Sequence, residues 1–166
     1  MKKYITLLCL SLLFFLCPYH TIKSLAAETP SGLYAKAAIL MDGSNQRVLF
    51  GKEEKTELPM ASTTKIMTCL YALEHGNLSD IVTFSDRAAS APKVHLGARA
   101  GSQFLLSDLL YALMLESYND AAVAIAEHLG GSVEAFCQAM TEEARSYGCY
   151  QTSFETPNGL DSDNHY

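Results

Sequence analysis

Two residues whose types and spacing suit chemistry are Ser62 and Lys65. Positions i and i+3 share one face of a helix, so the lysine amine can lie within hydrogen-bond reach of the serine hydroxyl. A serine hydroxyl is a weak nucleophile until a base removes its proton, and a desolvated lysine can act as that base because burial favours its neutral form. The pair therefore predicts acyl transfer through an acyl group on Ser62.

A second motif, Ser117-Tyr118-Asn119, strengthens this interpretation. By itself, Ser-x-x-Lys also fits a helix-capping serine followed by a solvated lysine. Ser117 or Asn119 alone could likewise be the N-cap of the helix that follows. However, the second motif falls between two predicted helices, where a short connection can aim side chains into a cleft. Together the two motifs favour a catalytic site.

The residues around both motifs resemble one family. Residues 61–68, A-S-T-T-K-I-M-T, are similar to the active-site segment of the low-molecular-mass penicillin-binding proteins, the serine-type D-alanyl-D-alanine carboxypeptidases. Residues 109–122 resemble the second motif of that family, usually S-G-N-D-A, and residues 128–132 and 156–160 resemble further family segments. The resemblance covers nearly all of the chain after residue 26.

The resemblance implies a mixed α/β catalytic domain of the penicillin-binding-protein and β-lactamase type. It implies a carboxypeptidase that removes the terminal D-alanine of peptidoglycan stem peptides ending in D-Ala-D-Ala, with β-lactam antibiotics as covalent inhibitors and no metal or organic cofactor. Ser62 would be acylated and Lys65 would be its general base. Ser117 would relay a proton toward the leaving D-alanine, and Asn119 would bind the substrate backbone. Tyr118 replaces the family's small residue, which leaves the width of the cleft open.

The family's third motif, K-T-G or H-T-G on a later strand, has no match. Lys55-Thr56-Glu57 precedes Ser62 and lacks the glycine, and no lysine follows Lys93. The resemblance thus implies that later strands of the sheet are missing and that residues 27–166 are a partial catalytic domain with an N-terminal hairpin and a helical cluster. We expect this fragment alone to be marginally stable and to turn over little substrate. Stem-peptide preference, oligomeric state and a C-terminal membrane anchor stay open.

Two rival functions remain at this point. A class A β-lactamase-like hydrolase would require Asp at position 118 and a downstream glutamate motif, and neither is evident. A non-catalytic penicillin-sensing or wall-binding domain would keep Ser62 without turnover. Measuring turnover after acylation separates the second rival from an enzyme.

The first 26 residues are typical of a secretory signal peptide. A basic start, Met1-Lys2-Lys3, precedes an apolar run over residues 4–17, which is shorter than the roughly 18 residues that span a bilayer. Ser24-Leu25-Ala26 predicts cleavage after Ala26. We therefore expect an exported, extracytoplasmic protein of the cell envelope.

Composition excludes some partners. Cleavage reduces the basic residues from 12 to 9 against 18 acidic residues, a net charge of −9, which disfavours nucleic-acid binding. Three cysteines remain, Cys69, Cys137 and Cys149. Their odd number and irregular spacing fit neither a disulfide framework nor a metal site, so we expect Cys69 and Cys137 to be buried free thiols.

Hydrophobic periodicity predicts the elements that position the motifs. Two apolar runs, residues 37–41 and 48–50, flank a Gly/Asn turn and predict an antiparallel hairpin. A helix beginning at Ser62, with an apolar stripe of Ile66, Met67, Leu70 and Leu73, is expected to be central. The other predicted elements are a strand over residues 81–84, an irregular stretch over 85–101, a helix capped by Ser107-Asp108, and helices over 121–129 and 132–147.

Overall fold

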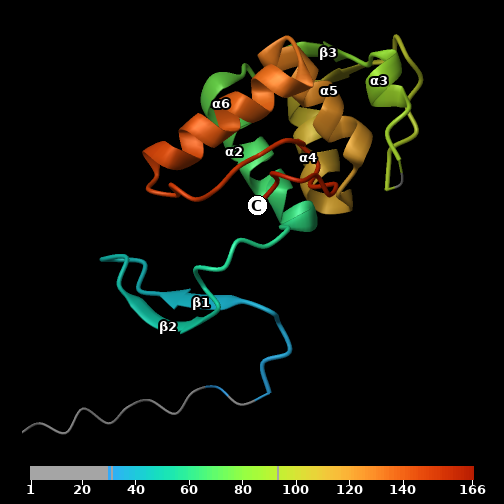
Figure 1. Cartoon of the computed structure of the whole chain (residues 1–166). Helices are drawn as coiled ribbons and strands as arrows, with labels where there is room; N and C mark the ends of the chain where they lie inside the picture. The colour runs from blue at the N-terminus through green and yellow to red at the C-terminus, as the bar shows by residue number, and fades with distance from the viewer. Residues whose placement is uncertain (1–29, 31, 93) are drawn as a thin grey trace, which may run out of the picture. The chain divides into compact units, whose positions relative to one another are not determined.

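The computed structural model describes residues 30, 32–92 and 94–166 (Figure 1). These residues belong to two compact units, one ending at Glu54 and one formed by residues 55–166, and we describe each by itself. The predicted signal peptide, residues 1–26, lies outside the described residues. Within the described ranges, no helix is both long and apolar enough to cross a membrane.

The first unit contains the predicted hairpin. Strand β1 (Ala38–Met41) pairs in antiparallel fashion with β2 (Val48–Lys52). The Asp42 carboxylate stabilises the turn because it accepts hydrogen bonds from Ser44 N at 2.9 Å and from Asn45 Nδ2 at 3.0 Å. A hydrogen bond from the Ser44 hydroxyl, followed by these two, holds the pKa of Asp42 below its ordinary value. The hairpin prediction is confirmed.

The second unit is a cluster of helices with a small sheet. In chain order it contains η1 (Ala61–Thr63), α2 (Thr64–His75), β3 (Ile81–Thr83), α3 (Asp86–Ala89), β4 (Gln103–Leu105), α4 (Leu106–Glu116), α5 (Asn119–Gly130) and α6 (Val133–Ser146). Strands β3 and β4 are antiparallel, and Val82 lies opposite Phe104. Helix α5 contacts α2, α3, α4, α6 and β3, which makes it the centre of this unit (Figure 1).

Helix α5 is central because its N-terminal two turns are buried all round. Every residue from Asn119 to Ala126 is buried. Several of these residues are alanines, whose small side chains let the neighbouring helices approach closely. Larger core side chains come from those neighbours, namely Leu109 and Leu113 of α4 and Phe136 and Met140 of α6. The core thus lies around α5 and holds the residue that begins it, Asn119, in a fixed place.

Helix α2 differs from the prediction that it is central. Of its apolar stripe, Ile66 is 60% and Leu73 53% exposed, whereas Met67 and Leu70 are half-buried. The buried face instead carries Thr64, Lys65 and Thr68, together with Ala72. Polar side chains on the buried face need hydrogen-bond partners inside the protein. The inward face of α2 is therefore built for a polar site.

The starts of the other helices agree only partly with the predicted capping residues. Helix α4 begins at Leu106, directly after β4, so the predicted Ser107-Asp108 cap is wrong and these residues lie in the first turn. The stretch predicted as irregular contains α3, whose start is capped by Ser85 Oγ accepting from Ala88 N. Helix α6 matches its prediction, with Ser132 Oγ accepting from Ala135 N at 3.1 Å.

Candidate active site

Ser62 and Lys65 meet at the start of α2. Ser62 lies exposed in the single turn η1, which begins with Ala61 at a left-handed φ of 49°. Lys65 lies in the first turn of α2 and is 2% exposed. Its Nζ lies 3.1 Å from Ser62 Oγ, within hydrogen-bond distance. The predicted nucleophile and base are therefore in contact.

The lysine amine has two further partners. Nζ donates to Asn119 Oδ1 and to the backbone carbonyl oxygen of Asn158, both at 2.9 Å. Burial lowers the pKa of Lys65 because desolvation disfavours the charged amine. A neutral amine has two N–H groups and one lone pair. When both N–H groups bind these oxygens, the lone pair faces Ser62 and can accept its proton.

The second motif contributes two residues to the same place. Ser117 follows α4 in a left-handed conformation, with φ of 60°, and Asn119 begins α5. Asn119 is 6% exposed, and its Nδ2 donates to Pro92 O at 3.1 Å. In the described part of the chain, no hydrogen bond joins the Ser117 hydroxyl to Ser62 or Lys65. Ser117 lines the same pocket as Ser62 without a hydrogen bond to either residue of the pair.

These residues surround one pocket of about 290 Å³. Its lining is Ala61, Ser62, Val94, Ser117, Asn119, Asn158, Gly159, Leu160 and Asp161. The exposed Ser62 hydroxyl can therefore meet a small ligand, while the lysine that would activate it is buried behind. This is the geometry that acyl transfer requires: an accessible nucleophile backed by a desolvated base.

Residues 156–160 complete the site, although sequence reasoning gave them no role beyond family resemblance. Besides the Asn158 contact, Pro157 O accepts from the buried Thr68 Oγ1 at 2.6 Å. Gly159 has φ of 82°, and a Cβ built on it would lie 1.8 Å from Ala61 O. Only glycine permits both this conformation and this close approach.

Asp120 holds the loop whose residue Val94 lines the pocket. Its carboxylate is 1% exposed and accepts hydrogen bonds from the backbone N–H groups of Leu96 and Gly97, each at 2.9 Å. Asn119 N also donates to Val94 O at 2.7 Å. The loop that carries Val94 is thus fixed to the start of α5 by buried polar contacts. The sequence signal for this role was only that Asp120 follows the second motif.

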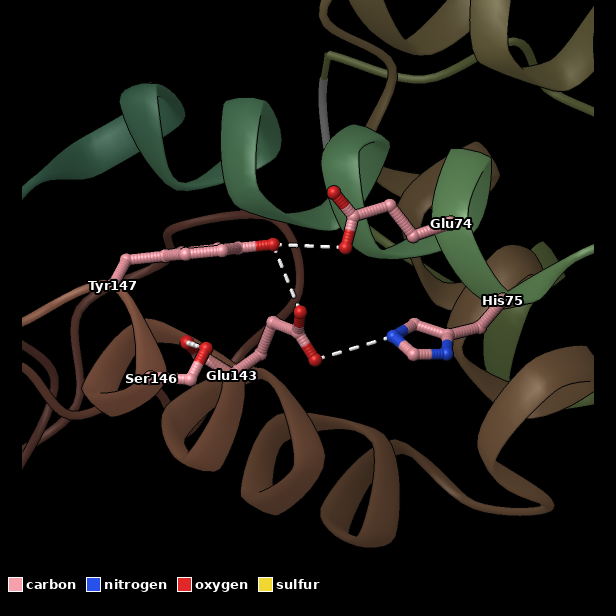
Figure 2. A network of polar contacts seen from close by, with 5 residues as sticks. All are labelled: Glu74, His75, Glu143, Ser146 and Tyr147. Carbon is pink, nitrogen blue, oxygen red and sulfur yellow. Dashed lines mark hydrogen bonds and ion pairs between the residues drawn. The ribbon is translucent and has the colours of Figure 1, made fainter.

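Glu74, His75 and Glu143 form a separate polar cluster that joins α2 to α6 (Figure 2). His75 Nε2 lies 3.1 Å from Glu143 Oε2, and the Tyr147 hydroxyl lies 2.8 Å from both Glu74 Oε2 and Glu143 Oε1. The hydrogen bonds to these carboxylates, Glu143 first, raise the pKa of Tyr147. The cluster contains a cation-ligand combination, but its atoms already pair with one another at the surface. The cluster links α2 to α6 at the surface, whereas the Lys65 amine lies in a buried site.

The cysteines are only partly as predicted. Cys137 is buried, and burial raises its pKa to about 12, which favours the protonated thiol at neutral pH. Cys69 is only partly buried, and Cys149 is exposed.

Comparison with known proteins identifies the family. The Peptidase S11 family model, described as D-alanyl-D-alanine carboxypeptidase, matches residues 23–166. The chain belongs to this family. Among family members, the D-alanyl-D-alanine carboxypeptidase DacF of Bacillus subtilis is 37% identical over 137 residues, which are 80% of this chain and 35% of DacF. DacC of Escherichia coli is 32% identical over 161 residues, 90% of this chain and 40% of DacC.

Solved structures agree. The crystal structure of penicillin-binding protein 5 from Haemophilus influenzae matches with a TM-score of 0.75 and 32% identity, over 83% of this chain and 42% of that one. The predicted fold class, mixed α/β of the penicillin-binding-protein type, is confirmed by this match. The chain spans less than half the length of each of these three proteins.

Proposed function

We propose that the protein containing this chain is a serine D-alanyl-D-alanine carboxypeptidase that acts on peptidoglycan stem peptides. The observation that supports this most is the position of Lys65 Nζ, shared between Ser62 Oγ, Asn119 Oδ1 and Asn158 O. A lysine held in this way, desolvated and in contact with an exposed serine, is suited to general-base catalysis. Family membership supplies the substrate class, a peptide that ends in D-Ala-D-Ala.

In the first step, Ser62 Oγ attacks the carbonyl carbon of the D-Ala–D-Ala amide and its proton passes to Lys65 Nζ. The C–N bond then breaks, and the departing amine of D-alanine takes up a proton. Ser117, which lines the same pocket, is the residue we assign to relay that proton. The product is an ester between Ser62 and the shortened stem peptide. In this scheme Asn119 binds the substrate backbone and also orients Lys65.

In the second step, water attacks the ester carbonyl, the C–O bond to Ser62 breaks, and Ser62 regains its proton. Negative charge develops on the carbonyl oxygen in both steps. The positive end of the α2 dipole lies next to Ser62 and favours that charge. None of these steps requires a metal or an organic cofactor. A β-lactam, whose amide resembles D-Ala-D-Ala, would acylate Ser62 in the same way.

The predicted signal peptide supports export, and the substrate supports action on the outer face of the membrane. The net charge of −9 after cleavage disfavours binding to nucleic acid. We therefore place the protein in the cell envelope.

The test is release of D-alanine from a D-Ala-D-Ala peptide by the product of the complete gene, with Ser62→Ala as the matched control. We expect steady turnover that the variant lacks. Acylation by penicillin without D-alanine release would instead indicate the non-catalytic sensor. Rapid hydrolysis of penicillin without D-alanine release would indicate the β-lactamase-like enzyme.

A further inference from the structure

Residues 153–166 form a loop that closes on itself against the start of α2. Ser153 and Tyr166 exchange two backbone hydrogen bonds, at 2.7 and 3.0 Å. Within the loop, the Glu155 carboxylate accepts hydrogen bonds from Ser162 Oγ and from Asn164 N. The loop contains neither helix nor strand, so these side-chain and terminal contacts define its shape. It is the loop that carries the Asn158 carbonyl to Lys65.

His165 lies inside this loop and is 2% exposed. Its Nδ1 accepts hydrogen bonds from the backbone N–H groups of Glu155 at 3.0 Å and Thr156 at 3.4 Å. Its Nε2 lies 2.8 Å from Thr64 Oγ1, on the first turn of α2. A ring nitrogen that accepts from N–H groups carries no proton, so the neutral ring has its proton on Nε2 and donates it to Thr64.

We propose that neutral His165, protonated on Nε2, is a positioning residue that bridges the 153–166 loop to α2 and thereby sets the Asn158 carbonyl against the Lys65 amine. The bridge has one end on the backbone just before Asn158 and the other on Thr64, the neighbour of Lys65. This inference rests on the proposed function, since it concerns the same base.

The position of the Asn158 carbonyl matters because of what it does to the amine. The two oxygens that bind Lys65 N–H groups leave the lone pair directed at Ser62. If the Asn158 oxygen moves away, the amine can rotate and the lone pair loses its direction.

A second contact, from Thr68 Oγ1 to Pro157 O, holds the same stretch one turn further along α2. We therefore expect loss of His165 to loosen the carbonyl without releasing the whole loop.

The surroundings of His165 keep it neutral. Burial lowers its pKa, while the Glu155 and Asp161 carboxylates of its own loop act in the opposite direction. Helix α2 presents the Thr64 hydroxyl, with the Lys65 amine next to it. The charged groups of α6 near the loop are Glu134, Glu142 and Arg145, which line a hollow with Glu155. Protonation on Nδ1 would remove the acceptor for two backbone N–H groups, which geometry opposes independently of charge.

Two variants of the complete gene product break one end of the bridge each. His165→Asn keeps an acceptor at the Nδ1 position, and His165→Gln keeps a donor at the Nε2 position. Both should lower the acylation rate constant k2 for a fluorescent penicillin by roughly 10- to 100-fold, since misplacement of about 1 Å can cost about 10²-fold. The dissociation constant of the non-covalent penicillin complex should stay unchanged. His128→Gln, at a surface histidine of α5, is the matched control and should leave k2 unchanged.

A second measurement does not depend on variants. In ¹⁵N spectra of histidine-labelled wild-type protein, His165 should show an unprotonated Nδ1 and a protonated Nε2 throughout the pH range in which a free imidazole titrates. Folded variants with wild-type k2, or a His165 that carries its proton on Nδ1 or gains a second proton in that pH range, would overturn the inference. If penicillin does not acylate the wild-type protein, the proposed function itself fails. The k2 of the wild-type protein therefore separates that outcome from failure of the inference about His165.

Discussion

The side-chain nitrogen of Lys65 lies 2.9 Å from the backbone oxygen of Asn158, a residue 93 positions further along the chain. This contact joins the first turn of α2 to a loop without regular secondary structure. Together with Asn119 Oδ1, the Asn158 oxygen occupies both N–H groups of a neutral amine. The neutral state that we propose for Lys65 as the base is therefore oriented by the fold, and the following predictions test that arrangement in the product of the complete gene.

Replacing Lys65 by arginine should remove the base while keeping the positive charge. A guanidinium does not lose its proton at working pH, so it cannot accept the Ser62 proton. Loss of a general base typically costs about 10²- to 10⁴-fold, and we expect that range for penicillin acylation of Lys65→Arg. Stopped-flow or gel-based labelling measures the rate. Lys55→Arg, at an exposed lysine, is the control, and equal rates in the two variants would exclude Lys65 as the base.

The rate of acylation should rise with pH as Lys65 loses its proton. Because burial lowers the pKa of this lysine, the neutral form becomes dominant at a lower pH than for an exposed lysine. The pH–rate profile of k2 should therefore reach its plateau below the ordinary lysine range. A profile that is still rising through the pKa of free lysine would contradict the desolvated base.

Gly159→Ala should disturb the site more than another glycine substitution of the same conformation. At Gly159 the new methyl group would meet Ala61 O at 1.8 Å, next to Ser62, and φ is also positive. At Gly148, with φ of 90°, nothing lies within 4 Å of the added Cβ. Gly148→Ala should cost about 1–2 kcal/mol of unfolding free energy, from backbone conformation alone. Gly159→Ala should cost more and also slow acylation; equal effects in denaturation and labelling would contradict the close packing.

Thr68→Val tests the second contact between α2 and the loop. The substitution keeps the shape of the side chain but leaves the buried Pro157 carbonyl without its donor. We expect a loss of about 1–3 kcal/mol in unfolding free energy, measured by chemical denaturation. Thr83→Val is the control because its hydroxyl accepts an exposed hydrogen bond from Gln103, and its effect should stay within about 0.5 kcal/mol. A neutral Thr68→Val would mean that the loop does not depend on this bond.

The sequence was sufficient to predict the pairing of Ser62 with Lys65, because i, i+3 spacing at a helix start is a local property. It also predicted that Asn119 belongs to the site, through a motif between two helices. It did not predict the contribution of Asn158, because a backbone carbonyl has no residue-type signature and its partner is distant in the chain. His165 was passed over for a related reason: it shares no spacing with other site residues, and its role depends on how the loop closes.

The positions of the helices along the chain were predicted better than the faces that they bury. The periodicity of Ile66 and Leu73 indicated a helix correctly, yet α2 turns these residues outward and buries Thr64 and Thr68. These threonines face inward because their hydroxyls form hydrogen bonds with the 153–166 loop. Helical periodicity of apolar residues cannot show this, because a prediction from periodicity takes the apolar face to be the buried one. The start of α4 was misplaced because cap-type residues such as Ser107 also occur inside a first turn.

The central claim, that Ser62 is the acylated nucleophile, is tested most directly by mapping a penicillin adduct by mass spectrometry. We predict one equivalent of adduct on the tryptic peptide of residues 56–65, located by fragmentation to Ser62 and absent from a folded Ser62→Ala variant. An adduct on another residue, or undiminished labelling of Ser62→Ala, would contradict the account.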